Sequence, residues 1–105
     1  MSVLNDHVAC FNEGLRTGDW SAMLADFTDD AELEFVGVPV GPFVGRAAIA
    51  EAYRTQPPDD ELVIVEDRGD GTARYAWATT PQQPAGDLRL TVVGDRIMRV
   101  VVTFD

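Results

Sequence analysis

The apolar residues of this chain change their spacing at Pro57-Pro58, and this change constrains the fold more than any other feature. Before the two prolines, apolar residues mostly recur every three or four positions, as on one face of a helix. After them, apolar and polar residues alternate to the end of the chain, which is typical of strands. Because proline stops a helix, the pattern predicts helices first and a meander of strands afterwards. The expected fold class is α+β, with three N-terminal helices packed on a curved antiparallel sheet.

Glycines and prolines mark the borders of the expected elements. Gly18 follows an apolar helical stripe and suits a left-handed helix cap, and the pair Asp70-Gly71 suits a hairpin turn. The expected elements are, in order, helices over residues 4–15 and 20–27, a polar turn at 28–30, a strand over 31–36, a loop over 37–45, a helix over 46–56, and strands over 61–67, 72–80, 87–93 and 96–104.

Length and charge limit the kinds of partner. The 105 residues fit one domain, residues 1–105, and the net charge of −10 would repel nucleic acid and anionic membranes. No apolar stretch approaches the roughly 20 residues that span a bilayer, and the N-terminus lacks a secretion signal, so a cytoplasmic location is expected. Cys10 is the only cysteine, which excludes an intrachain disulfide. No ligand spacing for a metal is visible, and neither a metal nor a cofactor is expected.

Two motifs carry a family resemblance. Residues 18–32 read GD-x-x-A-M-x-x-x-F-x-D-D-A-E, and residues 41–53 read G-P-F-x-G-R-x-A-I-x-x-A-Y. In order and spacing they resemble the SnoaL-like and ketosteroid-isomerase-like branch of the nuclear transport factor 2 superfamily. The resemblance implies a cone-shaped, cystatin-like roll whose apolar interior holds a ligand. It also implies a homodimer.

The same resemblance locates the positions of isomerase chemistry. In ketosteroid isomerases a helix-one tyrosine and a protonated late-strand acid bind the oxyanion, and an aspartate moves the proton. The tyrosine position falls on Phe11, the aspartate position on Phe35, and the acid position near Leu88 or Arg89, with Asp87 adjacent. Phenyl rings neither donate a hydrogen bond nor carry a proton. Steroid isomerisation by the familiar mechanism is therefore not expected.

Three residues remain candidates for a rearranged catalytic site. Tyr53 matches a supporting tyrosine of some isomerases, but without the primary tyrosine it has nothing to support, and an aromatic core role explains it better. His7 lies one helical turn before Phe11 and could reach a cavity mouth as a general base, but without a carboxylate partner in the sequence it is expected at the surface. Asp87 is the third candidate.

Alternation predicts which side chains point to the concave side. They form either a ligand cavity for a small apolar molecule or a core filled by its own side chains. The expected lining residues are Phe11, Leu15, Trp20, Met23, Phe27, Phe35, Phe43, Tyr53, Tyr75, Trp77, Leu88, Leu90, Met98, Val100, Val102 and Phe104.

The opposite face of the sheet mixes arginines with small apolar residues. Arg74, Arg89 and Arg99 alternate there with alanine, threonine and valine, and so apolar a face is unusual in water. The sequence therefore predicts a homodimer contact on the convex face. Three functions stay open: a domain that binds an apolar ligand, a dimerising module with a filled core, and an isomerase or cyclase with a rearranged site.

Overall fold

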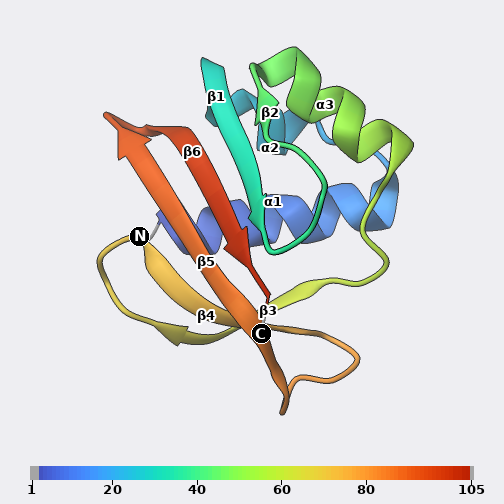
Figure 1. Ribbon diagram of the computed structural model, residues 1–105, viewed down its shortest axis with the longest axis vertical. Helices are drawn as coiled ribbons and strands as arrows, with labels where there is room; N and C mark the ends of the chain where they lie inside the picture. The colour runs from blue at the N-terminus through green and yellow to red at the C-terminus, as the bar shows by residue number, and fades with distance from the viewer. Residues whose placement is uncertain (1–2, 105) are drawn as a thin grey trace.

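Three helices cover one face of a curved, six-stranded sheet in the computed structural model, which describes residues 3–104 (Figure 1). The helices are α1 (Val3–Thr17), α2 (Ser21–Ala25) and α3 (Arg46–Thr55), and the strands are β1 (Phe27–Val36), β2 (Phe43–Val44), β3 (Leu62–Asp67), β4 (Thr72–Trp77), β5 (Pro84–Val93) and β6 (Arg96–Thr103). The predicted α+β class is confirmed. The strand order is β2-β1-β6-β5-β4-β3, and β1 runs parallel to β6 while the other neighbours are antiparallel.

Helix α1 forms where the apolar stripe predicted it. Leu4, Val8 and Phe11 are buried on one side, at the spacing that brings helical side chains onto a single face. Gly18 ends the helix with a φ of 80°, and its N–H donates a hydrogen bond to the Gly14 carbonyl at 2.7 Å. The predicted left-handed cap is therefore confirmed.

Residues 28–30 belong to β1, so the predicted polar turn is wrong. Helix α2 is correspondingly short, and Phe27 starts the strand by pairing with Ile97 of β6. The register between β1 and β6 shifts between Phe27 and Glu32, which absorbs the polar residues between them into an irregular strand. Pairing with β6 outweighs the local preference of Thr-Asp-Asp for a turn.

A bulge in β6 reverses the facing of Met98. Thr91 pairs with Arg99 and Val92 pairs with Ile97, so Met98 is an extra residue between two pairs. Ile97 is buried in consequence and Met98 is 39% exposed. The prediction that Met98 points to the concave side is wrong, because the alternation it assumed is interrupted at this bulge.

The sheet is tightly packed where α2 and the start of α3 cover it. Five side chains in this region, here called the closed core, are each no more than 1% exposed: Met23, Phe27, Ala31, Ile49 and Ile97. Trp20 lies on Gly14 of α1, where a Cβ atom would come within 2.4 Å of the indole ring.

None of the helices within residues 3–104 is long and apolar enough to cross a membrane.

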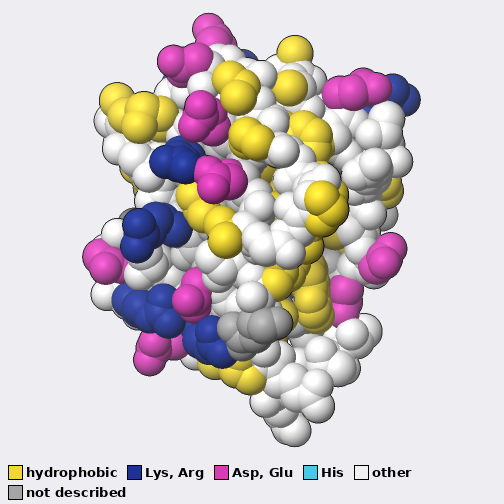
Figure 2. Space-filling view, in the orientation of Figure 1, with side chains coloured by type: hydrophobic (Ala, Val, Ile, Leu, Met, Phe, Trp, Pro, Cys, Tyr) yellow, Lys and Arg dark blue, Asp and Glu magenta, His cyan; other side chains and the backbone are white. Residues whose placement is uncertain are grey.

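Charged side chains pair across the sheet face that lies opposite α1. Figure 2 shows basic and acidic groups interspersed with hydrophobic ones on this side. Arg99 of β6 pairs with Glu34 of β1 and lies 3.8 Å from a Glu32 carboxylate oxygen, and Arg74 of β4 lies 3.3 Å from Asp87 of β5. We call this side the outer sheet face. These ion pairs are partly exposed, and such pairs contribute little to stability.

Candidate functional site

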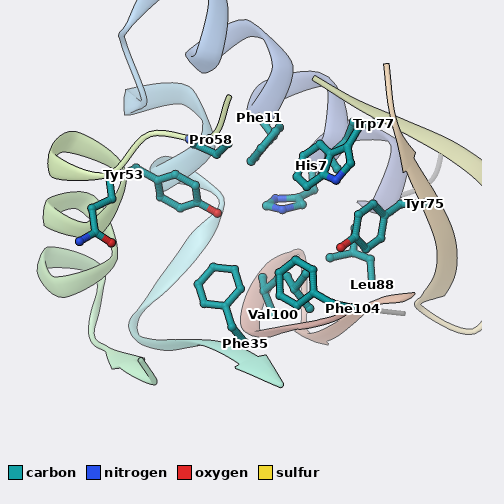
Figure 3. Close-up of a pocket in the computed structure, with 13 residues that line it drawn as sticks. His7, Phe11, Phe35, Tyr53, Pro58, Tyr75, Trp77, Leu88, Val100 and Phe104 are labelled. Atoms are coloured by element: carbon teal, nitrogen blue, oxygen red, sulfur yellow. The ribbon is translucent and has the colours of Figure 1, made fainter. Parts of the chain in front are cut away.

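A cavity of about 220 Å³, here called the inner cavity, lies between α1, the end of α3 and strands β4 to β6. Figure 3 shows most of the labelled lining side chains pointing toward a common centre. They are His7, Phe11, Phe35, Tyr53, Gln56, Pro58, Leu62, Tyr75, Trp77, Leu88, Val100, Val102 and Phe104. Most of these groups are aromatic or aliphatic, as is usual for sites that bind small molecules.

A second hollow of about 260 Å³, the outer cavity, adjoins the first. The two share Phe35, Tyr53, Gln56, Pro58 and Phe104 as lining residues. The outer cavity adds Val38 and Val40 from the loop before β2, together with Leu33, Phe43 and Ala52. The shared residues therefore form the boundary between an inner and an outer compartment.

The structure separates the predicted lining residues into two groups. Those that line the inner cavity are Phe11, Phe35, Tyr53, Tyr75, Trp77, Leu88, Val100, Val102 and Phe104, and Phe43 lines the outer one. Those that line neither are Leu15, Trp20, Met23, Phe27, Leu90 and Met98.

The residues that miss both cavities do so for different reasons. Met23 and Phe27 fill the closed core, where no space remains for a ligand. Trp20 is held against Gly14 and Tyr53, and Leu90 is buried beside Leu4 at a separate surface hollow. Leu15 is half-buried one turn beyond Phe11 on α1, and Met98 points outward at the bulge.

Sequence reasoning missed the residues at the mouth. Gln56, Pro58 and Leu62 line the inner cavity, whereas the sequence indicates only that the two prolines end a helix. Asn12 of α1 fixes this region, because its side-chain amide donates to the Leu62 carbonyl at 2.9 Å and accepts from the Leu62 N–H at 2.8 Å. The amide thus bonds the backbone of the edge strand β3 as a neighbouring strand would. Only the positions of the prolines gave a signal for this segment.

His7 lies inside the protein, so the prediction of a surface histidine is wrong. The imidazole is 2% exposed, lines the inner cavity and packs on Phe27 with ring centroids 5.8 Å apart. Its Nδ1 atom is buried and has no hydrogen-bond partner among the residues that the structure describes. Burial lowers the pKa of His7 to about 4, because the charged imidazolium would lose its hydration. The imidazole is therefore neutral at pH 7.

Tyr53 faces the same cavity from α3. Its ring lies 4.7 Å from that of Trp20 and 6.1 Å from that of Phe11, measured between centroids. In Figure 3 its hydroxyl points toward His7. Burial raises the pKa of Tyr53 well above its usual value, so the phenol keeps its proton. Tyr75, by contrast, donates its hydroxyl to the Thr103 carbonyl at 3.2 Å.

Asp87 lies outside the cavity and is not placed for catalysis there. Its carboxylate accepts hydrogen bonds from Arg68 at 3.2 Å and Arg74 at 3.3 Å on the outer sheet face, while the next residue, Leu88, points inward. Burial acts to raise the pKa of Asp87, but the two arginines outweigh it and the net pKa is lowered. An ionised, outward carboxylate does not fit the role of a protonated oxyanion donor.

The chemistry available to the two cavities is that of neutral groups. Among residues 3–104, no Asp, Glu, Lys or Arg lines either cavity. The same part of the chain contains no cluster of three His, Cys, Asp or Glu residues able to hold a metal ion. The arrangement can enclose an apolar molecule and offer it hydrogen bonds from His7 and Tyr53.

Comparisons with known proteins agree with this architecture. An NTF2-like protein of unknown function from Burkholderia xenovorans has a TM-score of 0.71 at 14% identity, over 98% of this chain and 83% of that chain. A Kribbella flavida protein with the provisional name ketosteroid isomerase gives 0.68 at 17% identity, over 98% and 78%. A Xanthomonas campestris protein with the provisional name polyketide cyclase gives 0.58 at 21% identity, over 98% and 90%.

These structures are less than 25% identical to the chain, so they show its fold and not its activity. No curated protein matches the sequence. The model of the SnoaL-like domain family, however, matches residues 8–104, which is most of the chain. This protein belongs to the SnoaL-like domain family.

Proposed function

We propose that the protein binds a small apolar molecule in the inner cavity. The observation that carries the proposal is an unfilled, largely apolar space of about 220 Å³ beneath α1. An apolar cavity of about 150 Å³ is enough to bind benzene. The inner cavity therefore has room for a ring and its substituents, and the proposal favours a binding domain over a dimerising module with a filled core.

A second candidate function is an isomerase or cyclase with a rearranged site, acting on a steroid-like or polyketide-like substrate. It is supported by the position of His7 and Tyr53 on one cavity, since a neutral imidazole can accept a proton and a phenol can donate a hydrogen bond. The names of the Kribbella and Xanthomonas proteins point the same way. Phe11 and Phe35 at the isomerase positions speak against the familiar steroid mechanism.

A thermal-shift screen with steroids, polyketide fragments and fatty acids tests the binding function. At least one apolar class should raise the melting temperature, because a ligand that binds only the folded state stabilises it. The matched control is Val102→Phe, which places a larger side chain in the inner cavity and should abolish the shift. If no class stabilises the wild-type protein, the proposed function is wrong.

We also propose a homodimer through the outer sheet face, in a cytoplasmic protein. Val101 of β6 contributes to this proposal, since it is only partly covered and lies on the outer sheet face between Glu34 of β1 and Arg89 of β5. Sedimentation equilibrium should give the mass of a dimer, and Val101→Glu should give a monomer. Val44→Glu, on the short edge strand β2, is the control and should leave the mass unchanged. Cell fractionation tests the location.

A further inference from the structure

We propose that the ligand is an uncharged molecule with an apolar body of about one ring and a hydroxyl group, and that His7 holds this hydroxyl at the closed end of the inner cavity. The inference rests on the proposed binding function and specifies the chemistry of the ligand. It follows from one buried polar group, the charge of the cavity wall, and the size and direction of the cavity.

The buried polar group is Nδ1 of His7. It is shielded from solvent and has no hydrogen-bond partner among residues 3–104, whereas most buried polar atoms in proteins are paired. Nδ1 itself is covered, so a molecule in the inner cavity, which the imidazole lines, can reach only the other ring nitrogen, Nε2. In a neutral imidazole one nitrogen carries the N–H and the other accepts, and a hydroxyl suits Nε2 in either state because it donates and accepts.

Tyr53 supplies a second hydrogen-bonding group near the same point. Figure 3 shows its hydroxyl directed toward His7 from the opposite wall. A ligand hydroxyl between the two could bond the imidazole and the phenol together. Tyr75 also lines the cavity, but its hydroxyl is already bonded to the Thr103 carbonyl.

The wall excludes charged ligands. Since no Asp, Glu, Lys or Arg of the described chain lines either cavity, a carboxylate or an ammonium group would enter without a counter-ion. Burying an unpaired charge is far more costly than burying a hydroxyl that finds a partner. Fatty acids and other carboxylates are therefore disfavoured, and an alcohol or phenol fits.

Exposure gives the cavity a direction. His7, Leu88 and Val100 are each 2% exposed, and they mark the closed end. Phe104, at 42%, and the exposed Gln56 mark the mouth. The hydroxyl must therefore enter first, with the apolar body toward Phe104. Because the inner cavity exceeds only modestly the space that benzene needs, a ligand larger than about one substituted ring must extend into the outer cavity.

Three matched probes test the inference: 4-ethylphenol, ethylbenzene and 4-ethylbenzoate, titrated calorimetrically at pH 7. We expect 4-ethylphenol to bind about tenfold more tightly than ethylbenzene, the effect of one satisfied hydrogen bond, and 4-ethylbenzoate not to bind. Equal affinities for the phenol and the hydrocarbon would overturn this inference and leave the proposed function standing. Failure of both neutral probes to bind would also overturn this inference, and the thermal-shift screen would then decide the proposed function separately.

Variants then assign the preference to His7. His7→Phe should abolish the tenfold preference for 4-ethylphenol over ethylbenzene, so that the two affinities become about equal. Tyr53→Phe should reduce this preference in part. Tyr75→Phe is the matched control, with the same loss of a phenolic hydroxyl from the cavity wall, and should keep the preference. Retention of the full preference in His7→Phe contradicts the assignment.

A measurement on the wild-type protein keeps the test independent of the variant's folding. His7 is the only histidine, so its imidazole resonances are unambiguous in NMR spectra. They should shift on addition of 4-ethylphenol and change much less with ethylbenzene. Identical responses to the two probes would contradict the hydrogen bond.

Discussion

The closed core and the wall of the inner cavity are built from the same strands, yet one is solid and the other hollow. In β1, Phe27 is 1% exposed in the closed core and Phe35 borders both cavities. In β6, Ile97 belongs to the first region and Val102 to the second. Alternation, together with the bulge at Met98, decides which face of the sheet a side chain takes. The helical side chains that face the sheet decide whether space remains. Met23 and Ile49 fill the closed core, whereas His7, Phe11 and Tyr53 line the inner cavity without filling it.

The largest expected contrast is between two phenylalanines of β1. Phe27→Ala should lower the free energy of unfolding by about 3–5 kcal/mol, because it opens a void in a packed region. Phe35→Ala should cost about 1–2 kcal/mol, since its ring already borders empty space and loses fewer contacts. Urea denaturation of both variants measures the difference. Equal losses of unfolding free energy in the two variants would mean that the two regions are equally well packed, and would contradict the contrast between them.

The next contrast concerns pH, because a histidine borders the hollow region. The folded-state pKa of His7 is about 4, below the value of about 6.5 expected for the unfolded chain. As the pH falls below about 6.5, the unfolded state gains a proton that the folded state cannot. Stability should therefore fall by about 1.4 kcal/mol per pH unit until the folded pKa is reached, about 3 kcal/mol in total.

Urea denaturation between pH 7 and pH 4.5 measures this slope, with His7→Phe as the control that should lack it. Carboxylates whose pKa is lowered, such as Asp87, lose their contribution to stability only at lower pH. They therefore do not account for a stability change between pH 7 and pH 4.5. NMR titration of His7 gives its pKa directly. A value near 6.5 would show that water reaches the imidazole and would contradict its burial.

The sequence predicted the faces of the elements better than their packing. Helical stripes and alternation located α1, α3 and most strands, and the two motifs identified the family, because these are local patterns. The bulge at Met98 and the entry of residues 28–30 into β1 depend on pairing with distant strands. His7 was misassigned for a different reason. Its position on the buried side of α1 follows from the local spacing to Leu4 and Phe11, whereas the surface prediction relied on the absence of a carboxylate partner in the sequence. Only three-dimensional contacts show that its buried Nδ1 has no partner among residues 3–104.

The smallest expected effect comes from enlarging one side chain in each region of β6. Val102→Phe should change the free energy of unfolding by no more than about 1 kcal/mol and in the stabilising direction, because the added ring enters existing space. Ile97→Phe should lower it by about 1–3 kcal/mol, because the closed core has no room for the extra atoms. Thermal and urea denaturation of these two variants compare the regions by enlarging a side chain in each. The two alanine variants compare the same regions by removing side-chain atoms. If Val102→Phe is as destabilising as Ile97→Phe, the inner cavity does not admit a ring, and a ligand with an aromatic body would be excluded by the same result.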